Sequence, residues 1–166
     1  MEIERKFLLL NDSYRQLATR RVHIHQAYLS RTENCSVRVR QWDDKAFITI
    51  KSRPVKGSFS RYEFEYEIPV ADAETLFRLA LPGSIDKYRY LVPLEGTDLT
   101  VEVDEFLGDN EGLVVAEIEL ESETQIFPMP DYLGQDVTYD PRYLNSYLAT
   151  HPFKTWRSRE NNTKNA

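Results

Sequence analysis

Charged residues of like sign recur two positions apart along this chain, and most of the positions between them are apolar. The first strand-like stretch shows the pattern, because Glu2 and Glu4 flank Ile3. Alternate residues of a β-strand point to opposite faces, so this spacing predicts strands with one charged face and one apolar face. A single such strand would indicate a solvated edge strand, since Glu and Lys are mostly exposed. Six pairs occur, however: Glu2/Glu4, Arg38/Arg40, Glu63/Glu65, Lys87/Arg89, Glu102/Asp104 and Glu117/Glu119.

Like charges on one enclosed face repel one another, and the repulsion grows as water is excluded. Six like-charged pairs in 166 residues therefore need either ligands of opposite charge or one another as partners. A barrel meets this need when its interior is charged and its apolar exterior is covered by helices. The predicted fold class is α+β, a closed eight-stranded antiparallel β-barrel (a tunnel) with helices packed outside.

Eight segments have the pattern of strands, and turn-forming residues such as Glu95-Gly96 separate them. Helical spacing predicts a helix over 71–81 and another over 140–151, where Asp140 is the N-cap and Pro141 takes the first helical position. A short helix is expected within 11–20. We expect a single domain over residues 1–153 and a polar C-terminal tail over 154–166. The expected strands cover residues 2–10, 23–31, 35–42, 45–52, 60–69, 86–94, 97–106 and 113–122.

Composition restricts the classes of function. The formal net charge of −6 argues against a general nucleic-acid binder, which is usually basic. Cys35 is the single cysteine, so no intrachain disulfide can form and a reducing compartment is expected. The N-terminus has no long apolar run, which predicts neither a signal peptide nor a membrane span. We therefore expect a cytoplasmic protein that has no membrane or nucleic-acid partner.

The two signs of charge indicate two ligands. Carboxylate clusters without cysteine or well-placed histidine suit hard divalent cations, Mg²⁺ or Mn²⁺, better than Zn²⁺. Clustered Arg and Lys suit phosphate oxygens, and the planar guanidinium of Arg offers two parallel donors. A divalent metal together with a polyphosphate is typical of phosphoryl transfer. The sequence has no G-x-x-x-x-G-K-[ST] motif, so a P-loop enzyme is not expected.

The N-terminal E-x-E-x-K motif, here Glu2, Glu4 and Lys6, resembles the signature of the CYTH superfamily, the triphosphate tunnel metalloenzymes. The resemblance continues in order to about residue 150, where VTYDPRYLNSYLA is similar to the closing segment of the family. E-x-E-x-K alone is a weak signal, whereas the ordered set is highly specific. The later matching residues are Tyr28, Arg38, Arg40, Lys51, Arg61, Glu63, Glu65, Lys87, Arg89, Asp104, Glu117 and Glu119.

The resemblance implies a tunnel of eight antiparallel strands that holds a triphosphate and a divalent metal, Mg²⁺ or Mn²⁺. It implies that Tyr28 and Lys51 position or activate the attacking water. The metal shell would be Glu2, Glu4, Asp104, Glu117 and Glu119. The phosphate chain would be held by Lys6, Arg38, Arg40, Arg61, Lys87 and Arg89. Further acidic residues of the tunnel, to which no specific role is assigned, are Glu63, Glu65 and Glu102.

The leading interpretation is a metal-dependent inorganic triphosphatase, which hydrolyses tripolyphosphate to diphosphate and phosphate. Three alternatives stay open. They are a class IV-type adenylate cyclase that converts ATP to cyclic AMP and diphosphate, a thiamine or nucleoside triphosphatase, and a non-catalytic binder of polyphosphate or nucleotide. A pure binder would not need a water-positioning pair such as Tyr28 and Lys51, so an enzyme is favoured. The expected partner is a small-molecule triphosphate, and the chain is expected to be a monomer or a homodimer.

Overall fold

The computed structural model describes residues 1–157 and builds them around one sheet of ten strands. Every pairing between strands is antiparallel. The strands are β1 (Glu2–Leu9), β2 (Arg20–Arg31), β3 (Cys35–Trp42), β4 (Lys45–Ser52), β5 (Ser60–Arg61), β6 (Glu63–Ile68), β7 (Ile85–Pro93), β8 (Thr100–Phe106), β9 (Val114–Glu119) and β10 (Leu133–Asp136).

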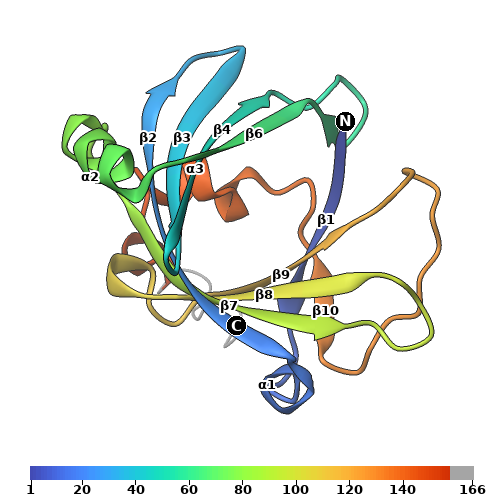
Figure 1. Cartoon of the computed structure of the whole chain (residues 1–166). Coiled ribbons are helices and arrows are strands. Elements are labelled where there is room, and N and C mark those ends of the chain that lie inside the picture. Colours follow the sequence, from blue (N-terminus) through green and yellow to red (C-terminus); the bar gives the residue numbers. More distant parts are fainter. Residues whose placement is uncertain (158–166) are drawn as a thin grey trace.

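The sheet curls into a barrel whose two ends meet at β1 (Figure 1). The order along the sheet is β1-β9-β8-β7-β2-β3-β4-β6, and β5 pairs back to β1 with Arg61 opposite Glu2. Only Tyr62 separates β5 from β6, so the two act as one interrupted strand and the ring has the eight predicted members. β10 is an additional strand that pairs with the C-terminal half of β1. The predicted antiparallel barrel is therefore confirmed, with one strand more than expected.

Apolar side chains cover much of the outer surface of the barrel. Helix α2 (Val70–Leu79) forms where a helix was predicted, and its Ala73 packs against Ala27, Val39 and Ala46 of the sheet. On another side the outward residues of β1, β7, β8 and β9 pack under α1 (Tyr14–Leu17) and the segment before β10. This cluster includes Phe7, Tyr14, Val92, Val103, Ile118, Phe127 and Tyr132. Covering the outer face in this way leaves the opposite, charged face to line the interior.

The chain after β10 forms short helical pieces instead of the single helix predicted over 140–151. Asp140 caps the first of them as expected, because its Oδ1 accepts a hydrogen bond from the Arg142 backbone N–H at 3.1 Å. That piece is the 3₁₀ helix η2 (Pro141–Tyr143); Leu144 is then extended, with φ −72° and ψ 136°. The separate helix α3 (Asn145–Leu148) follows, inside the outline of the ring in Figure 1. The break at Leu144 thus directs α3 towards one end of the barrel.

An apolar cluster fills the barrel end beside α3. Two further 3₁₀ helices, η1 (Gly108–Asn110) and η3 (Phe153–Thr155), lie at this end of the molecule, and Phe153 packs against the cluster. The chain is still packed beyond residue 154, where the polar tail was expected to begin. Trp156 is buried, and its ring centroid lies 5.7 Å from that of Tyr143. Residues 158–166 of the expected tail lie outside the part of the chain that the structure describes. The cluster includes Tyr28, Ile85, Phe106, Leu113, Val115, Val137, Tyr143, Leu148 and Trp156.

Gly83 allows the C-terminal segment to approach the loop between α2 and β7. Its φ of 93° favours glycine, and a Cβ at this position would lie 1.9 Å from the carbonyl oxygen of Ala149. The closed end of the barrel therefore depends on backbone contact as well as on apolar packing. None of the helices within residues 1–157 is long and apolar enough to cross a bilayer.

Candidate active site

The period-two pattern places both signs of charge inside the barrel. Lys6 of β1 lies opposite Glu117 of β9, and Arg89 of β7 lies opposite Asp104 of β8. Glu102 of β8 lies opposite Glu117 of β9, so two like charges are direct neighbours on adjacent strands. Directly opposed like charges destabilise a sheet unless other groups compensate them. The interior charges must therefore be understood as a network, and they divide into a basic chamber and an acidic mouth.

The basic chamber is a cavity near the end closed by α3. It brings Tyr28 and Lys51, the predicted water-positioning pair, into one space with five of the six residues predicted to bind phosphate. Lys87 is the exception. The chamber is lined by Glu4, Lys6, Tyr28, Ser36, Arg38, Arg40, Thr49, Lys51, Arg61, Arg89, Glu117, Leu144, Asn145 and Ser146.

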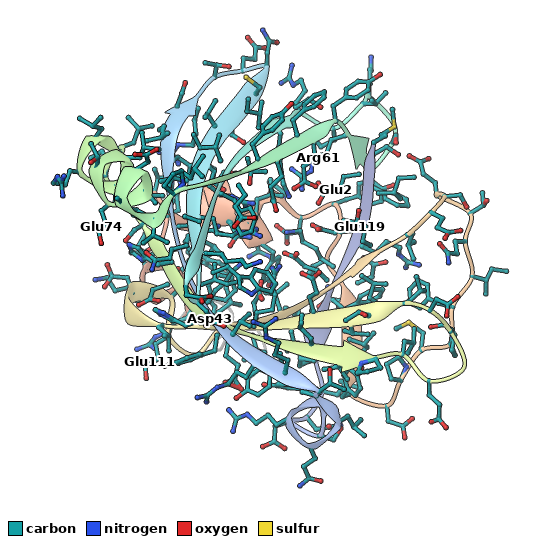
Figure 2. All side chains as sticks on the ribbon, viewed as in Figure 1. Glu2, Asp43, Arg61, Glu74, Glu111 and Glu119 are labelled. Carbon is teal, nitrogen blue, oxygen red and sulfur yellow. The ribbon has the colours of Figure 1, made fainter. Side chains whose placement is uncertain are left out.

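The acidic mouth is a second cavity that shares Glu4, Arg40, Lys51, Arg89 and Glu117 with the chamber. Figure 2 shows Glu2, Arg61 and Glu119 near one another beside the N-terminal part of β1, whereas Glu74 and Glu111 lie on the outside. The mouth is lined by Glu2, Glu4, Arg40, Trp42, Lys51, Glu63, Glu65, Arg89, Glu102, Glu117 and Glu119. A ligand that fills both cavities would pass from carboxylates to guanidinium groups.

The environment of Arg38 is the strongest indication that the chamber binds an anion. Its side chain is 5% exposed, and its Nε and Nη2 have no hydrogen-bond partner among the described residues. Burial lowers the pKa of neighbouring Arg40 to about 10, and the charges of Arg38 and Arg89 add to this effect. Buried guanidinium donors without acceptors are energetically unfavourable. An anion with several oxygens would supply the missing acceptors.

The mouth has an excess of negative charge, whereas the chamber has an excess of positive charge. Burial raises the pKa of Glu4, and the charge of Glu117 raises it further against the opposing effect of Lys6. Burial likewise raises the pKa of Glu119, and Glu2, Glu63 and Glu102 add to the increase. The pKa of Glu102 is also raised, first by burial. Carboxylates that are hard to ionise together are stabilised by a nearby cation.

The donor chemistry of the mouth fits Mg²⁺ or Mn²⁺, which prefer carboxylate oxygens. The Oε2 atom of Glu2 is buried and accepts no hydrogen bond from the rest of residues 1–157. Within the same residues, however, no three acidic, histidine or cysteine side chains are already arranged around a metal position. The carboxylates are engaged instead with cations, because Glu2 lies 3.1 Å from Lys51 and Glu4 lies 3.5 Å from Lys6. A metal held by Glu2 and Glu4 would compete with these ammonium groups and with Arg61, whose Nε lies 3.3 Å from Glu2 Oε2.

Asp104 and Lys87 lie on the inward face of the barrel, as the sequence predicts, and bind each other there. Both are fully buried and line neither cavity. The Asp104 carboxylate accepts from Lys87 Nζ at 2.8 Å and from two nitrogens of Arg89 at 2.7 and 2.8 Å. Burial opposes ionisation of Asp104, but the charges of Arg89 and Lys87 outweigh it and lower its pKa. In this geometry Asp104 supports Arg89, which itself faces the chamber.

Several residues of the site carry no charge and escaped the sequence analysis. Trp42 continues the inward face of Arg38 and Arg40 on β3, so the period of two could have identified it. Its ring lies 5.9 Å from the Arg89 guanidinium. Leu144, Asn145 and Ser146 come from the C-terminal segment, which has no strand pattern that could place them inside a barrel. The fully buried Gln26 also escaped notice, although its Oε1 accepts from Arg40 Nε at 3.3 Å.

The barrel with a charged interior is the fold of a known family. The CYTH domain model matches residues 1–143 of this chain. The chain belongs to the CYTH domain family, as the ordered set of motifs that begins with E-x-E-x-K predicted.

Two curated relatives belong to the same family and have similar lengths. The chain is 48% identical over 157 residues to an inorganic triphosphatase of Acetivibrio thermocellus, an alignment that covers 94% of this chain and 97% of the relative. It is 36% identical over 151 residues to an inorganic triphosphatase of Nitrosomonas europaea, and that alignment covers 89% of this chain and 96% of the relative. The crystal structure of the inorganic triphosphatase NE1496 superposes with a TM-score of 0.63 at 33% identity, covering 90% of this chain and 94% of that one. These relationships confirm the predicted family and fold, and membership of this family of tunnel metalloenzymes implies a divalent metal.

Proposed function

We propose that this protein hydrolyses inorganic tripolyphosphate to diphosphate and phosphate inside the barrel. The observation that carries the proposal is the set of unpartnered donors on buried Arg38, in a chamber that also contains Arg40, Lys6 and Arg89. Tripolyphosphate has the oxygen acceptors and the negative charge that such a chamber lacks. The names of the two curated relatives support the same activity.

The chain's own residues account for binding and orientation of the substrate. Arg38, Arg40 and Lys6 would hold the phosphate chain, and Arg89 would be kept in place by Asp104 behind it. Hydrolysis joins a water oxygen to the terminal phosphorus and breaks the bond from that phosphorus to the bridging oxygen. Lys51 lies where chamber and mouth meet, so we assign to it and to Tyr28 the positioning of this water.

A divalent cation, Mg²⁺ or Mn²⁺, would be held by carboxylates of the mouth, namely Glu2, Glu4, Glu117 and Glu119. It supplies positive charge that offsets the repulsion between phosphate oxygens and the attacking water. Asp104 was also predicted as a ligand, but its oxygens are already bonded to Arg89 and Lys87. We therefore propose that it acts through Arg89. A cytoplasmic location remains a prediction from the sequence.

Replacement of Arg38 tests the phosphate site. Arg38→Met should raise KM for tripolyphosphate by about 100-fold, because a doubly donating guanidinium is lost. The melting temperature should stay the same or rise, because the unpartnered charge and its repulsion of Arg40 disappear. Steady-state kinetics and thermal unfolding of the same preparation measure both effects.

The matched control is Arg21→Met, since Arg21 is exposed and stacks on Tyr88 at 4.4 Å, outside the barrel. It should keep the wild-type KM. An Arg38→Met enzyme with unchanged KM would show that the phosphate chain binds elsewhere. Product analysis on tripolyphosphate, ATP and thiamine triphosphate completes the test: rapid phosphate release from tripolyphosphate is expected, whereas cyclic AMP from ATP would replace the proposal with a cyclase.

Replacement of Glu2 tests the metal site. Glu2→Gln should raise the Mg²⁺ or Mn²⁺ concentration for half-maximal rate by about tenfold or more, because one charged oxygen ligand is lost. A metal titration of the rate, with calorimetric titration of Mn²⁺ alongside, measures the change. Glu74→Gln on α2 is the control, because Glu74 lies outside the barrel (Figure 2). Unchanged metal dependence in Glu2→Gln would remove Glu2 from the shell.

A further inference from the structure

Asn145 is an uncharged residue at the closed end of the chamber. It is the first residue of α3 and lines the chamber together with Leu144 and Ser146. Its side-chain Oδ1 accepts a hydrogen bond from Lys87 Nζ at 3.0 Å. Lys87 itself is fully buried and does not line the chamber. Asn145 therefore stands between a buried ammonium group and the chamber.

The contact with Lys87 fixes which way the Asn145 amide faces. An ammonium group only donates hydrogen bonds, so the amide atom turned towards Lys87 must be the carbonyl oxygen. The amide NH₂ is then turned away from Lys87, and it donates no hydrogen bond to any other residue of 1–157. Two N–H donors without a partner within residues 1–157 thus belong to a residue that lines the same chamber as Arg38, whose donors are also unpartnered.

We propose that Asn145 is a substrate-binding residue that donates hydrogen bonds from its amide to phosphate oxygens at the closed end of the chamber. The inference rests on the proposed function, since it assigns one further contact to the same phosphate chain. Tyr28, Ile85 and Leu148 form an apolar cluster at this end of the barrel, and Lys87, which lies behind Asn145, does not line the chamber. Asn145 would therefore hold the innermost phosphate of the substrate.

Two substitutions at this position separate substrate binding from support of Lys87. Asn145→Asp keeps an oxygen for Lys87 but replaces the amide donor with an acceptor, which repels phosphate. Asn145→Ala removes both interactions. A residue that only positions Lys87 would tolerate Asp and not Ala, whereas a phosphate ligand would be damaged more by Asp.

The experiment measures kcat, KM and the melting temperature of the full-length variants, and calorimetric binding of tripolyphosphate with metal ions removed by chelation. Asn145→Asp should raise KM and weaken binding by about tenfold or more, because a donor to a charged group becomes a like charge. Its kcat should change less than its KM, and its melting temperature should not fall, since Lys87 keeps a partner. Asn145→Ala should have the smaller increase in KM and the lower melting temperature.

Asn110→Asp provides the matched control. Asn110 is a buried asparagine whose Oδ1 likewise accepts a hydrogen bond, from the Phe153 backbone N–H at 2.8 Å, but it does not line the chamber. Its KM should equal that of the wild type. Wild-type binding in Asn145→Asp, with a defect only in Asn145→Ala, would overturn the inference and leave the proposed function intact. A wild-type protein that neither binds nor hydrolyses tripolyphosphate would overturn both.

Discussion

Lys51→Ala is expected to lower kcat for tripolyphosphate by about a thousandfold and to leave KM nearly unchanged, since positioned groups that assist proton transfer contribute on this scale. Lys51 Nζ lies 3.1 Å from Glu2 and 3.8 Å from Glu63, at the junction of the chamber and the mouth. The residues assigned to the phosphate chain remain in the variant, so substrate binding should persist. Steady-state kinetics and calorimetric binding of tripolyphosphate together measure the two effects.

The control for this substitution is Lys45→Ala, because Lys45 is an exposed lysine on the same strand, β4. It should retain wild-type kcat. If KM of Lys51→Ala rises by as much as kcat falls, Lys51 binds the substrate and does not position the water. The role proposed for Lys51 would then be wrong, although the proposed reaction would stand.

Asp104→Asn is expected to destabilise the fold by about 3–5 kcal/mol, the usual effect of removing one partner from a buried ion pair. The reason is that Lys87 and Arg89, which are 0% and 4% exposed, would lose the carboxylate that both of them contact. Chemical denaturation at neutral pH measures the free energy of unfolding. Activity should fall as well, because Arg89 would no longer be held towards the chamber.

The pH dependence of this difference provides a second test. The pKa of Asp104 is lowered in the folded protein, so its ionisation stabilises the fold above the ordinary aspartate range. That stability is lost as the pH falls towards the lowered pKa, and the difference between wild type and Asp104→Asn should shrink on acidification. Asp109→Asn is the control, because the Asp109–Lys154 pair is exposed and contributes little. A stable Asp104→Asn protein would show that Arg89 and Lys87 do not depend on this carboxylate.

The sequence predicted the barrel because the information is local. An alternation with period two assigns each residue to one of two faces, whichever strand becomes its neighbour. The alternation therefore correctly predicted that Arg38 and Arg40 share the inward face of β3. It also predicted that Glu117 and Glu119 share the inward face of β9. The ordered motifs added the family, which the domain match confirms. The role of each site residue stays a prediction until the variants are measured.

Asp104 shows what the alternation could not provide. Its inward direction follows from the sequence, but its partners follow from the register of β8 against β7, which sets it opposite Arg89. A carboxylate opposite an arginine is neutralised in place, whereas Glu119 lies opposite Glu4, and two carboxylates that face each other favour a nearby cation. Strand pairing, which depends on the whole barrel, thus gives inward carboxylates different neighbours.

The alternation of like charges is enough to predict a barrel with a charged interior and both a basic and an acidic group of residues. Where those groups meet, which carboxylates are already paired and how the C-terminal segment closes one end follow from the packed barrel alone. Asn145 illustrates the reason. It comes from a short helix after the break at Leu144, and its place in the chamber depends on long-range packing of α3 against the barrel. No local pattern of residues encodes such a contact, because it arises only once the sheet has closed.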